Sequence, residues 1–136
     1  MVKEVVHDPI FLAGKSELAT KEDLQVAQDL MDTLVAHKNG CVRMAANMIG
    51  VTKRIIAVNA GIIDFIMVNP VITAKDSPYE TEEGCLSLTG VRPAIRYQNI
   101  TVEYLDHNFN PMTRQYSGFI AQIIQHEIDH CSGIII

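Results

Sequence analysis

The most constraining feature of this chain lies near its C-terminal end, where residues 118–131 read GFIAQIIQHEIDHC. Ser117 can cap a helix over this segment, and Gly133 can end it. Apolar residues recur around most of the helix, at Phe119, Ile120, Ile123, Ile124 and Ile128. A helix that is apolar on most sides is buried. We therefore expect this helix in the middle of the fold, with the other elements packed around it.

The composition fits one globular domain over residues 1–136. A chain of this length can bury a hydrophobic core, and 48% hydrophobic with 20% charged residues excludes a disordered chain. The formal net charge of −5 argues against a nucleic-acid surface. No apolar run approaches the roughly 18 residues of a membrane span, and the first residues lack a signal-peptide pattern. We expect a cytoplasmic protein without membrane or direct nucleic-acid contacts.

The rest of the chain predicts one further helix and several strands. A helix is expected from Lys21, with an apolar stripe from Leu24 to Val35. Residues 1–20 resemble an irregular arm, and residues 40–50 a segment that crosses the interior. Strands are expected at 53–59, 62–69, 100–105 and 112–116. Pro70 interrupts the second of these strands, which can continue over residues 71–74 at a sheet edge. Because strands and helices do not alternate as in βαβ units, we predict an α+β fold of antiparallel sheets around the central helix.

Two histidines in the C-terminal helix are spaced for metal binding. His126 and His130 lie about 40° apart around a helix axis and about 6 Å along it, so both imidazoles can reach one ion. Glu127 lies beside them, where it can act on a metal-bound water, as in the HExxH arrangement of zinc hydrolases. The alternative is a chance pair of surface histidines. It fits poorly with an isoleucine-rich helix, where unpaired polar groups are costly.

A third metal ligand has to come from upstream, because no histidine or glutamate follows His130. The candidates are an acidic residue, Cys41, Cys85, His7, His37 and His107. An odd number of cysteines indicates reduced thiols, each of which is by default a buried apolar side chain. Cys85 stands out because Gly84 lets the backbone approach closely. A thiolate, two imidazoles and one open position form a known catalytic arrangement.

Two segments of the chain resemble the peptide deformylase family. Residues 83–87 (EGCLS) and 125–130 (QHEIDH) match the second and third motifs of that family without a substitution. The resemblance implies a hydrolase that removes the N-formyl group from the formyl-methionine of newly made bacterial polypeptides. It also implies that Cys85, His126 and His130 hold a divalent ion. This ion would be ferrous iron in the cell, replaceable by zinc, nickel or cobalt.

The implied chemistry agrees with the residues. A bound metal lowers the pKa of its water towards about 7. Glu127 would take the proton of this water and pass it to the leaving amine. The oxyanion would be held by the metal, by the backbone N–H of Leu86 and, in the family, by a glutamine of the first motif.

The first motif departs from the family pattern GxGxAAxQ. Cys41 and Arg43 replace the two glycines, and Met48 replaces the glutamine. Loss of one oxyanion donor typically lowers the rate by about 10²–10³. Asn47 can supply a donor if the segment shifts by one residue, or its amide can point elsewhere. The departures leave open an alternative, a deformylase-like protein that binds metal or formyl peptides with little or no turnover. We prefer the active enzyme, because the implied metal ligands and Glu127 are all intact.

The resemblance also implies substrate contacts. In the family the first-motif segment pairs with the substrate backbone, which places Val42, Arg43 and Asn47 at the substrate. Arg43 can extend into solvent, bind a substrate carboxylate or obstruct the pocket. We favour the solvated orientation, because a buried unpaired arginine is rare. Arg96 matches a family position near the pocket mouth, and Ile123 lines the pocket or packs in the core.

Other polar residues near these positions have structural alternatives. Arg96 can form an ion pair with Asp129 or Glu83, whereas Gln125 and Asp129 can anchor the helix or orient a ligand histidine. The expected partners are nascent formyl-methionyl peptides. The ribosome is a further possible partner. We expect it less, because many family members dock on it with a C-terminal helix beyond the position of Gly133, whereas this sequence stops shortly after Gly133.

Overall fold

The computed structural model describes residues 1–37, 43–59, 64–85 and 88–134, without the side chains of Cys85, Leu88 and Thr89. The elements in chain order are α1 (Pro9–Leu12), the 3-10 turn η1 (Lys21–Asp23), α2 (Leu24–Ala36), β1 (Arg43–Ala45), the 3-10 turn η2 (Ala46–Ile49), β2 (Ile55–Asn59), β3 (Asp64–Cys85), β4 (Leu88–Leu105), β5 (Pro111–Ser117) and α3 (Gly118–Cys131). None of the described helices has the length and hydropathy that crossing a lipid bilayer requires.

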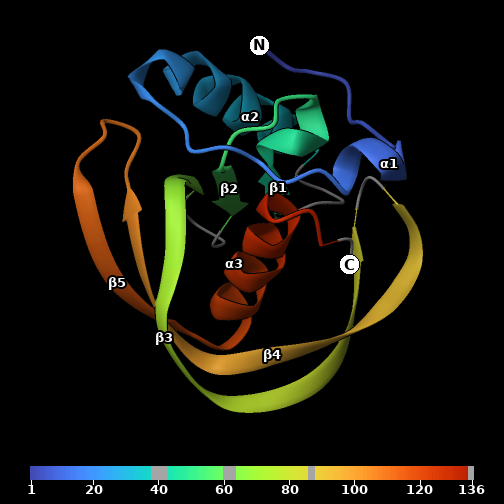
Figure 1. Ribbon diagram of the computed structural model, residues 1–136, viewed down its shortest axis with the longest axis vertical. Coiled ribbons are helices and arrows are strands. Elements are labelled where there is room, and N and C mark those ends of the chain that lie inside the picture. The colour runs from blue at the N-terminus through green and yellow to red at the C-terminus, as the bar shows by residue number, and fades with distance from the viewer. Residues whose placement is uncertain (38–42, 60–63, 86–87, 135–136) are drawn as a thin grey trace.

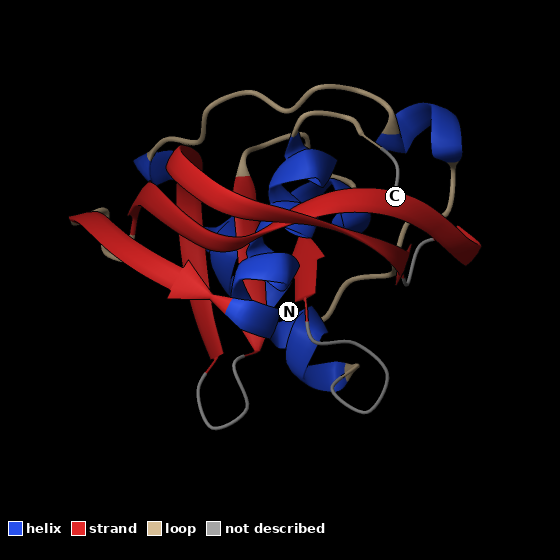
Figure 2. Cartoon of the chain, turned by 90° about the horizontal axis from the view of Figure 1, so that it is seen from below, coloured by secondary structure: helices blue, strands red, loops and turns tan. Residues whose placement is uncertain are grey.

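The strands form one antiparallel sheet in the order β1-β2-β3-β4-β5. β3 and β4 are much longer than the other strands, and they curve beneath α3 (Figure 1). β1, β2 and α2 lie on the opposite side of α3 in the same view. From below, the long strands run across the helices (Figure 2). The α3 helix is therefore enclosed, which confirms the predicted α+β fold around a central helix.

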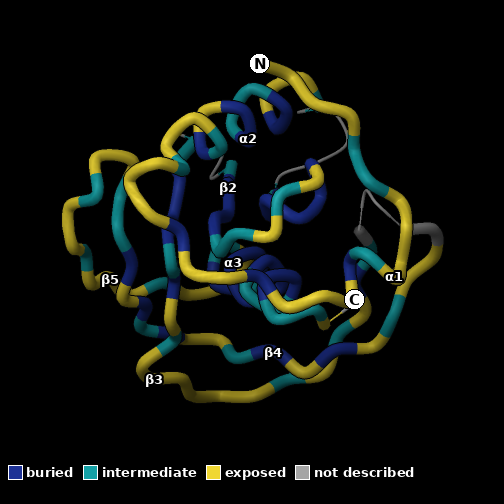
Figure 3. The backbone as a smooth tube through the Cα atoms, turned by 45° about the horizontal axis from the view of Figure 1, so that its top comes forward, coloured by how far each residue is buried: buried dark blue, intermediate teal, exposed yellow. Residues whose placement is uncertain are grey.

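Alternating side chains of β2 contribute to two core layers. Ile55 and Ala57 belong to a cluster with buried residues of α2, whereas Ile56 and Val58 belong to a second cluster with buried residues of α3. Side chains of a strand point alternately to the two faces of a sheet, so α2 and α3 cover opposite faces here. Figure 3 shows α3 as a largely buried segment at the centre of the molecule.

The path of β3 differs from our prediction. Pro70 was expected to interrupt a strand, but β3 continues through it to Cys85. The pairing register shifts between Val68 and Val71, and Asn69 has a φ of 51°. The Asn69 side chain bonds both the N–H (2.8 Å) and the C=O (3.0 Å) of Ala19. This irregularity lets the strand leave β2 and continue along β4, so the missing N–H of the proline is tolerated.

Two other elements were missed or shortened in the prediction. Residues 9–12 of the expected irregular arm form α1, where Asp8 accepts a hydrogen bond from the N–H of Ile10 (3.0 Å) and Pro9 occupies the first turn. β4 begins at Leu88 rather than at residue 100. Its first part pairs with the polar end of β3, where one exposed face removes the apolar pattern that a buried strand would show.

Candidate metal centre

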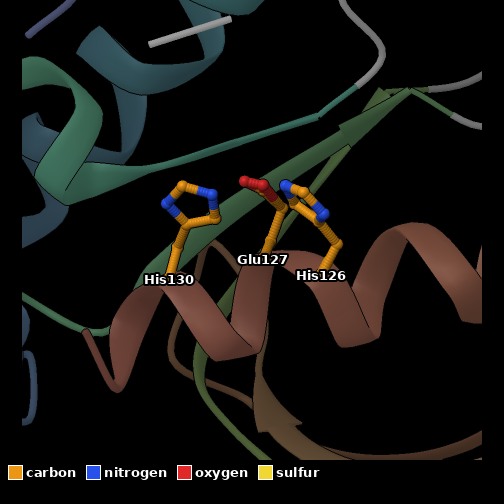
Figure 4. Close-up of side chains that lie close together, drawn as sticks. All are labelled: His126, Glu127 and His130. Atoms are coloured by element: carbon orange, nitrogen blue, oxygen red, sulfur yellow. The ribbon is translucent and has the colours of Figure 1, made fainter. Parts of the chain in front are cut away.

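The α3 helix brings His126, Glu127 and His130 together in the interior. Each of the three residues is 1% exposed. They offer ligand atoms that all lie within 4.8 Å of one another. Figure 4 shows the three side chains projecting from the same side of α3. The spacing that the sequence predicted for a shared ion is therefore present in the folded chain.

The residues of this group fit a divalent cation. His126 uses Nδ1 to contact the Glu83 carboxylate (2.8 Å), which directs Nε2 to act as the ligand atom. Both carboxylate oxygens of Glu127 are buried, and neither accepts a hydrogen bond from the described residues. A buried carboxylate without donors is costly. A cation, with water in its coordination sphere, would satisfy this carboxylate.

Glu83 is the centre of a buried hydrogen-bond network. Besides the His126 contact, its carboxylate accepts from Arg96 Nη2 (2.7 Å) and Gln122 Nε2 (2.8 Å). Arg96 also donates to Asp129 from Nη1 (2.7 Å). Burial would raise the pKa of Glu83, but the hydrogen bonds and the adjacent guanidinium charge outweigh burial and lower the pKa to about 2. Glu83 is therefore an anion that orients the His126 ring.

This role of Glu83 was missed by the sequence analysis, which looked to Gln125 and Asp129 for a histidine partner. Gln125 instead bonds the backbone N–H and C=O of Tyr97, both at 2.8 Å, and so anchors α3 to β4. Asp129 pairs with Arg96. A signal was present in the sequence, because a ligand histidine needs an acceptor and Glu83 is the acid next to Gly84 and Cys85.

The comparisons with known proteins agree with this geometry. A model of the family described as polypeptide deformylase matches residues 4–136. The chain belongs to the peptide deformylase family. It is 56% identical to a peptide deformylase of Clostridium beijerinckii over 136 residues, which is 100% of both chains.

Solved structures of deformylases show the same fold. A peptide deformylase from Thermotoga maritima has a TM-score of 0.89 at 25% identity, covering 99% of this chain and 95% of that one. A class I type b peptide deformylase from Acinetobacter baumannii with Met-Ala-Ser bound has a TM-score of 0.86 at 28% identity, covering 99% and 97%. The deformylase family therefore explains both the overall fold and the helix-borne histidine pair.

Arg43 does not take the solvated orientation that we favoured for this family member. It begins β1, it is half-buried, and its Nη2 donates to the backbone carbonyl of Gly84 at 2.7 Å. Gly84 lies at the far end of β3, next to Glu83 and Cys85. The guanidinium therefore joins two segments that flank the metal centre.

The other first-motif residues of this deformylase are buried. The amide nitrogen of Asn47 donates to the carbonyls of His130 (3.0 Å) and Leu12 (3.5 Å), so it anchors η2 instead of offering a donor to an oxyanion. The Met48 sulfur accepts from the N–H of Ala45 (3.4 Å). Of the two alternatives for Asn47, the structure therefore has the one in which the amide points away from the oxyanion, because its donors already have acceptors.

Two further candidates for substrate contacts lie in the protein interior. Arg96 is 4% exposed, and its guanidinium is held by Glu83 and Asp129. Ile123 is 2% exposed and belongs to the core cluster around α3. Arg96 therefore forms the ion pairs, and Ile123 the core packing, that we gave as the alternatives to substrate contacts.

Several predicted site residues lie outside the described part of the chain. These are Val42, Leu86 and the side chain of Cys85, of which only the strand backbone is described. Cys41 is outside it as well. Cys131 is described, and burial raises the pKa of its thiol to about 12, so it is a protonated core residue.

Proposed function

We propose that this chain is a metal-dependent hydrolase that removes the N-formyl group from the N-terminal formyl-methionine of newly made polypeptides. The observation that carries the proposal is the buried His126–Glu127–His130 group, within a chain of the deformylase family. Residues 1–136 would form one catalytic domain that acts on nascent formyl-methionyl peptides in the cytoplasm. The ribosome is the place where these substrates arise.

The proposed metal ligands are His126, His130 and Cys85. Support for the two histidines comes from the positions of their ring nitrogens, which lie within 4.8 Å of each other. Support for the thiolate comes from the position of Cys85 in the chain, directly after Glu83 and Gly84. Ferrous iron is proposed as the ion in the cell, with zinc, nickel or cobalt as replacements, because sites of this type accept several divalent ions. When bound, the ion would supply a Lewis acid that polarises the formyl group and acidifies a water molecule.

Glu127 is proposed as the general base and then the general acid. Its carboxylate would take a proton from the attacking water, whose oxygen forms a bond to the formyl carbon. The same carboxylate would return the proton to the methionine nitrogen as the C–N bond breaks, which yields formate and a free amine. The burial of Glu127 favours this role, since it keeps bulk water from exchanging the proton.

The oxyanion and the substrate backbone would be held mainly by backbone groups. We propose the N–H of Leu86 as an oxyanion donor, and Val42 with β1 as the strand that the extended peptide joins. Arg96 would act through Glu83 on the orientation of His126, and Ile123 would support α3 from the core.

The experiment is to incubate metal-loaded protein with formyl-Met-Ala-Ser under anaerobic conditions and to identify the products by mass spectrometry. We expect Met-Ala-Ser and formate, with no cleavage of acetyl-Met-Ala-Ser and none after metal removal by a chelator. Binding of formyl-Met-Ala-Ser without any formate release would contradict the proposal. It would favour a deformylase-like protein that binds formyl peptides without turning them over.

A further inference from the structure

We infer that Arg43 lowers the affinity of the centre for peptides, because its side chain latches the peptide-binding side. Its guanidinium donates to the Gly84 carbonyl, which holds the side chain across the path that we infer for an entering peptide. The inference rests on the proposed function for the identity of the peptide. It concerns a position where the family pattern has glycine, which has no side chain to form such a contact.

The two ends of the contact belong to opposite sides of the centre. Arg43 begins β1, which is the edge strand of the sheet and, among the described residues, pairs with β2 alone. β1 contacts α3, and Figure 4 shows it running past the side of the helix from which His130 and Glu127 project. β1 therefore offers a strand edge beside the proposed chemistry.

The opposite side is formed by the end of β3. Glu83 contacts the His126 ring at 2.8 Å, and Gly84 follows it directly. The Gly84 carbonyl thus lies one residue from a group that touches the metal centre. The Arg43–Gly84 hydrogen bond of 2.7 Å joins β1 to this segment, although the two residues are 41 positions apart.

An extended peptide binds a strand edge through its backbone N–H and C=O groups. Between β1 and the end of β3, the Gly84 carbonyl is an acceptor for such an N–H. The carbonyl has two lone pairs, so the guanidinium does not consume the acceptor completely. If the peptide enters between β1 and the end of β3, the obstacle is the Arg43 side chain itself, which a charged donor holds in position.

The latch can open when the Arg43–Gly84 hydrogen bond breaks. Arg43 is only half-buried, so its guanidinium can move into water without a large change in solvation. Every peptide that binds along β1 would have to displace it. Arg43 therefore lowers the affinity for such peptides and leaves the chemical step at Glu127 unchanged.

The test is the affinity of metal-loaded protein for the tripeptide Met-Ala-Ser, measured by isothermal titration calorimetry. We expect Arg43→Ala to bind it about tenfold more tightly than the wild type, because a hydrogen bond with a charged donor, Arg43 to Gly84, no longer has to be broken. The KM for formyl-Met-Ala-Ser should fall by a similar factor, with kcat within about twofold. Arg43→Gln, which is shorter and uncharged, should change the affinity in the same direction.

Arg114→Ala is the matched control, because it removes an exposed arginine from β5. It should leave both constants unchanged. Unchanged affinity in the Arg43 variants would overturn the inference, and so would weaker binding, which would make Arg43 a direct substrate contact. Met-Ala-Ser binding requires no turnover. Tighter binding by Arg43→Ala without deformylation would therefore contradict the proposed function and leave the latch supported.

Discussion

At the scale of single residues, this chain differs from the family pattern at the position of an oxyanion donor. Met48 stands where the family has glutamine, and its sulfur accepts a hydrogen bond from the Ala45 N–H. Asn47 donates to two backbone carbonyls instead. Neither side chain offers a donor that the oxyanion of the proposed reaction can use, which leaves the metal and the Leu86 N–H for this task.

Met48→Gln is therefore expected to raise kcat for formyl-Met-Ala-Ser by about 10-fold or more, since one oxyanion donor is worth about 10²–10³ in rate. Steady-state kinetics at equal metal content measure the effect. Met48→Leu keeps an apolar side chain of similar size and serves as the control. A kcat that does not rise in Met48→Gln, in a variant that folds normally, would show that this donor does not limit the reaction.

The sequence predicted the residues of the centre unevenly. His126, Glu127 and His130 could be identified because a helix fixes their geometry within one turn. The roles of Glu83 and Arg43 could not be identified, since each depends on a contact with a residue about 40 positions away. Such contacts are set by the bend of β3 and not by any local pattern.

The helices and strands were also predicted correctly where local sequence sets their bounds, and less well where distant contacts do. α3 begins and ends where its cap and glycine predicted, and β5 starts one residue before its expected position. The length of β4 was underestimated, because its first part has one face in solvent and lacks an apolar period. The continuation of β3 through Pro70 depends on hydrogen bonds between the Asn69 side chain and the Ala19 backbone. Strand propensities describe single residues and therefore do not predict such a distant contact.

The end of α3 gives a prediction for a glycine. Gly133 has a φ of +76°, and a Cβ added there would lie 2.3 Å from the carbonyl oxygen of Ala13. Gly90 has a φ of +79°, but an added Cβ would meet no atom within 4 Å. Gly90→Ala should therefore cost only the backbone strain of about 1–2 kcal/mol, whereas Gly133→Ala should cost clearly more.

Urea denaturation of both variants measures this difference in unfolding free energy. Gly133→Ala has to shift the backbone that follows α1 or the end of α3, because the contacting atom of Ala13 belongs to the main chain. Equal losses in the two variants would mean that the close approach of Ala13 is not part of the native packing.

At the scale of the whole molecule, the Glu83 network ties the end of β3 to both β4 and α3. The Glu83 carboxylate has a pKa of about 2 in the folded chain, whereas its ordinary pKa is 4.5. A folded pKa below the unfolded one means that the stabilisation is complete above pH 4.5. It is lost as the pH falls from 4.5 towards 2.

The metal-free wild type should therefore be more stable than Glu83→Gln at pH 7, and the difference should shrink as the pH falls below 4.5. Denaturant titrations at a series of pH values give the two unfolding free energies. A difference that stays constant down to pH 3 would show that the Glu83 charge is not the source of the stabilisation.

Metal binding should also stabilise the whole fold, because the centre exists only in the native chain. Ni²⁺ at about 100 times its dissociation constant is expected to add about 2.7 kcal/mol to the unfolding free energy. The thermal unfolding midpoint should rise in the wild type and fall back with a chelator. His130→Ala and Cys85→Ser should lose most of this rise, and an undiminished rise in Cys85→Ser would exclude the thiolate as a ligand.

The central claim is metal-dependent deformylation with Glu127 as the proton carrier. It is tested most directly by kcat/KM for formyl-Met-Ala-Ser, measured anaerobically for the wild type and Glu127→Ala at equal metal content. We predict turnover by the wild type and a loss of about 10²–10⁴ in the variant, the usual worth of a general acid–base. A wild-type rate no higher than that of Glu127→Ala would contradict the claim.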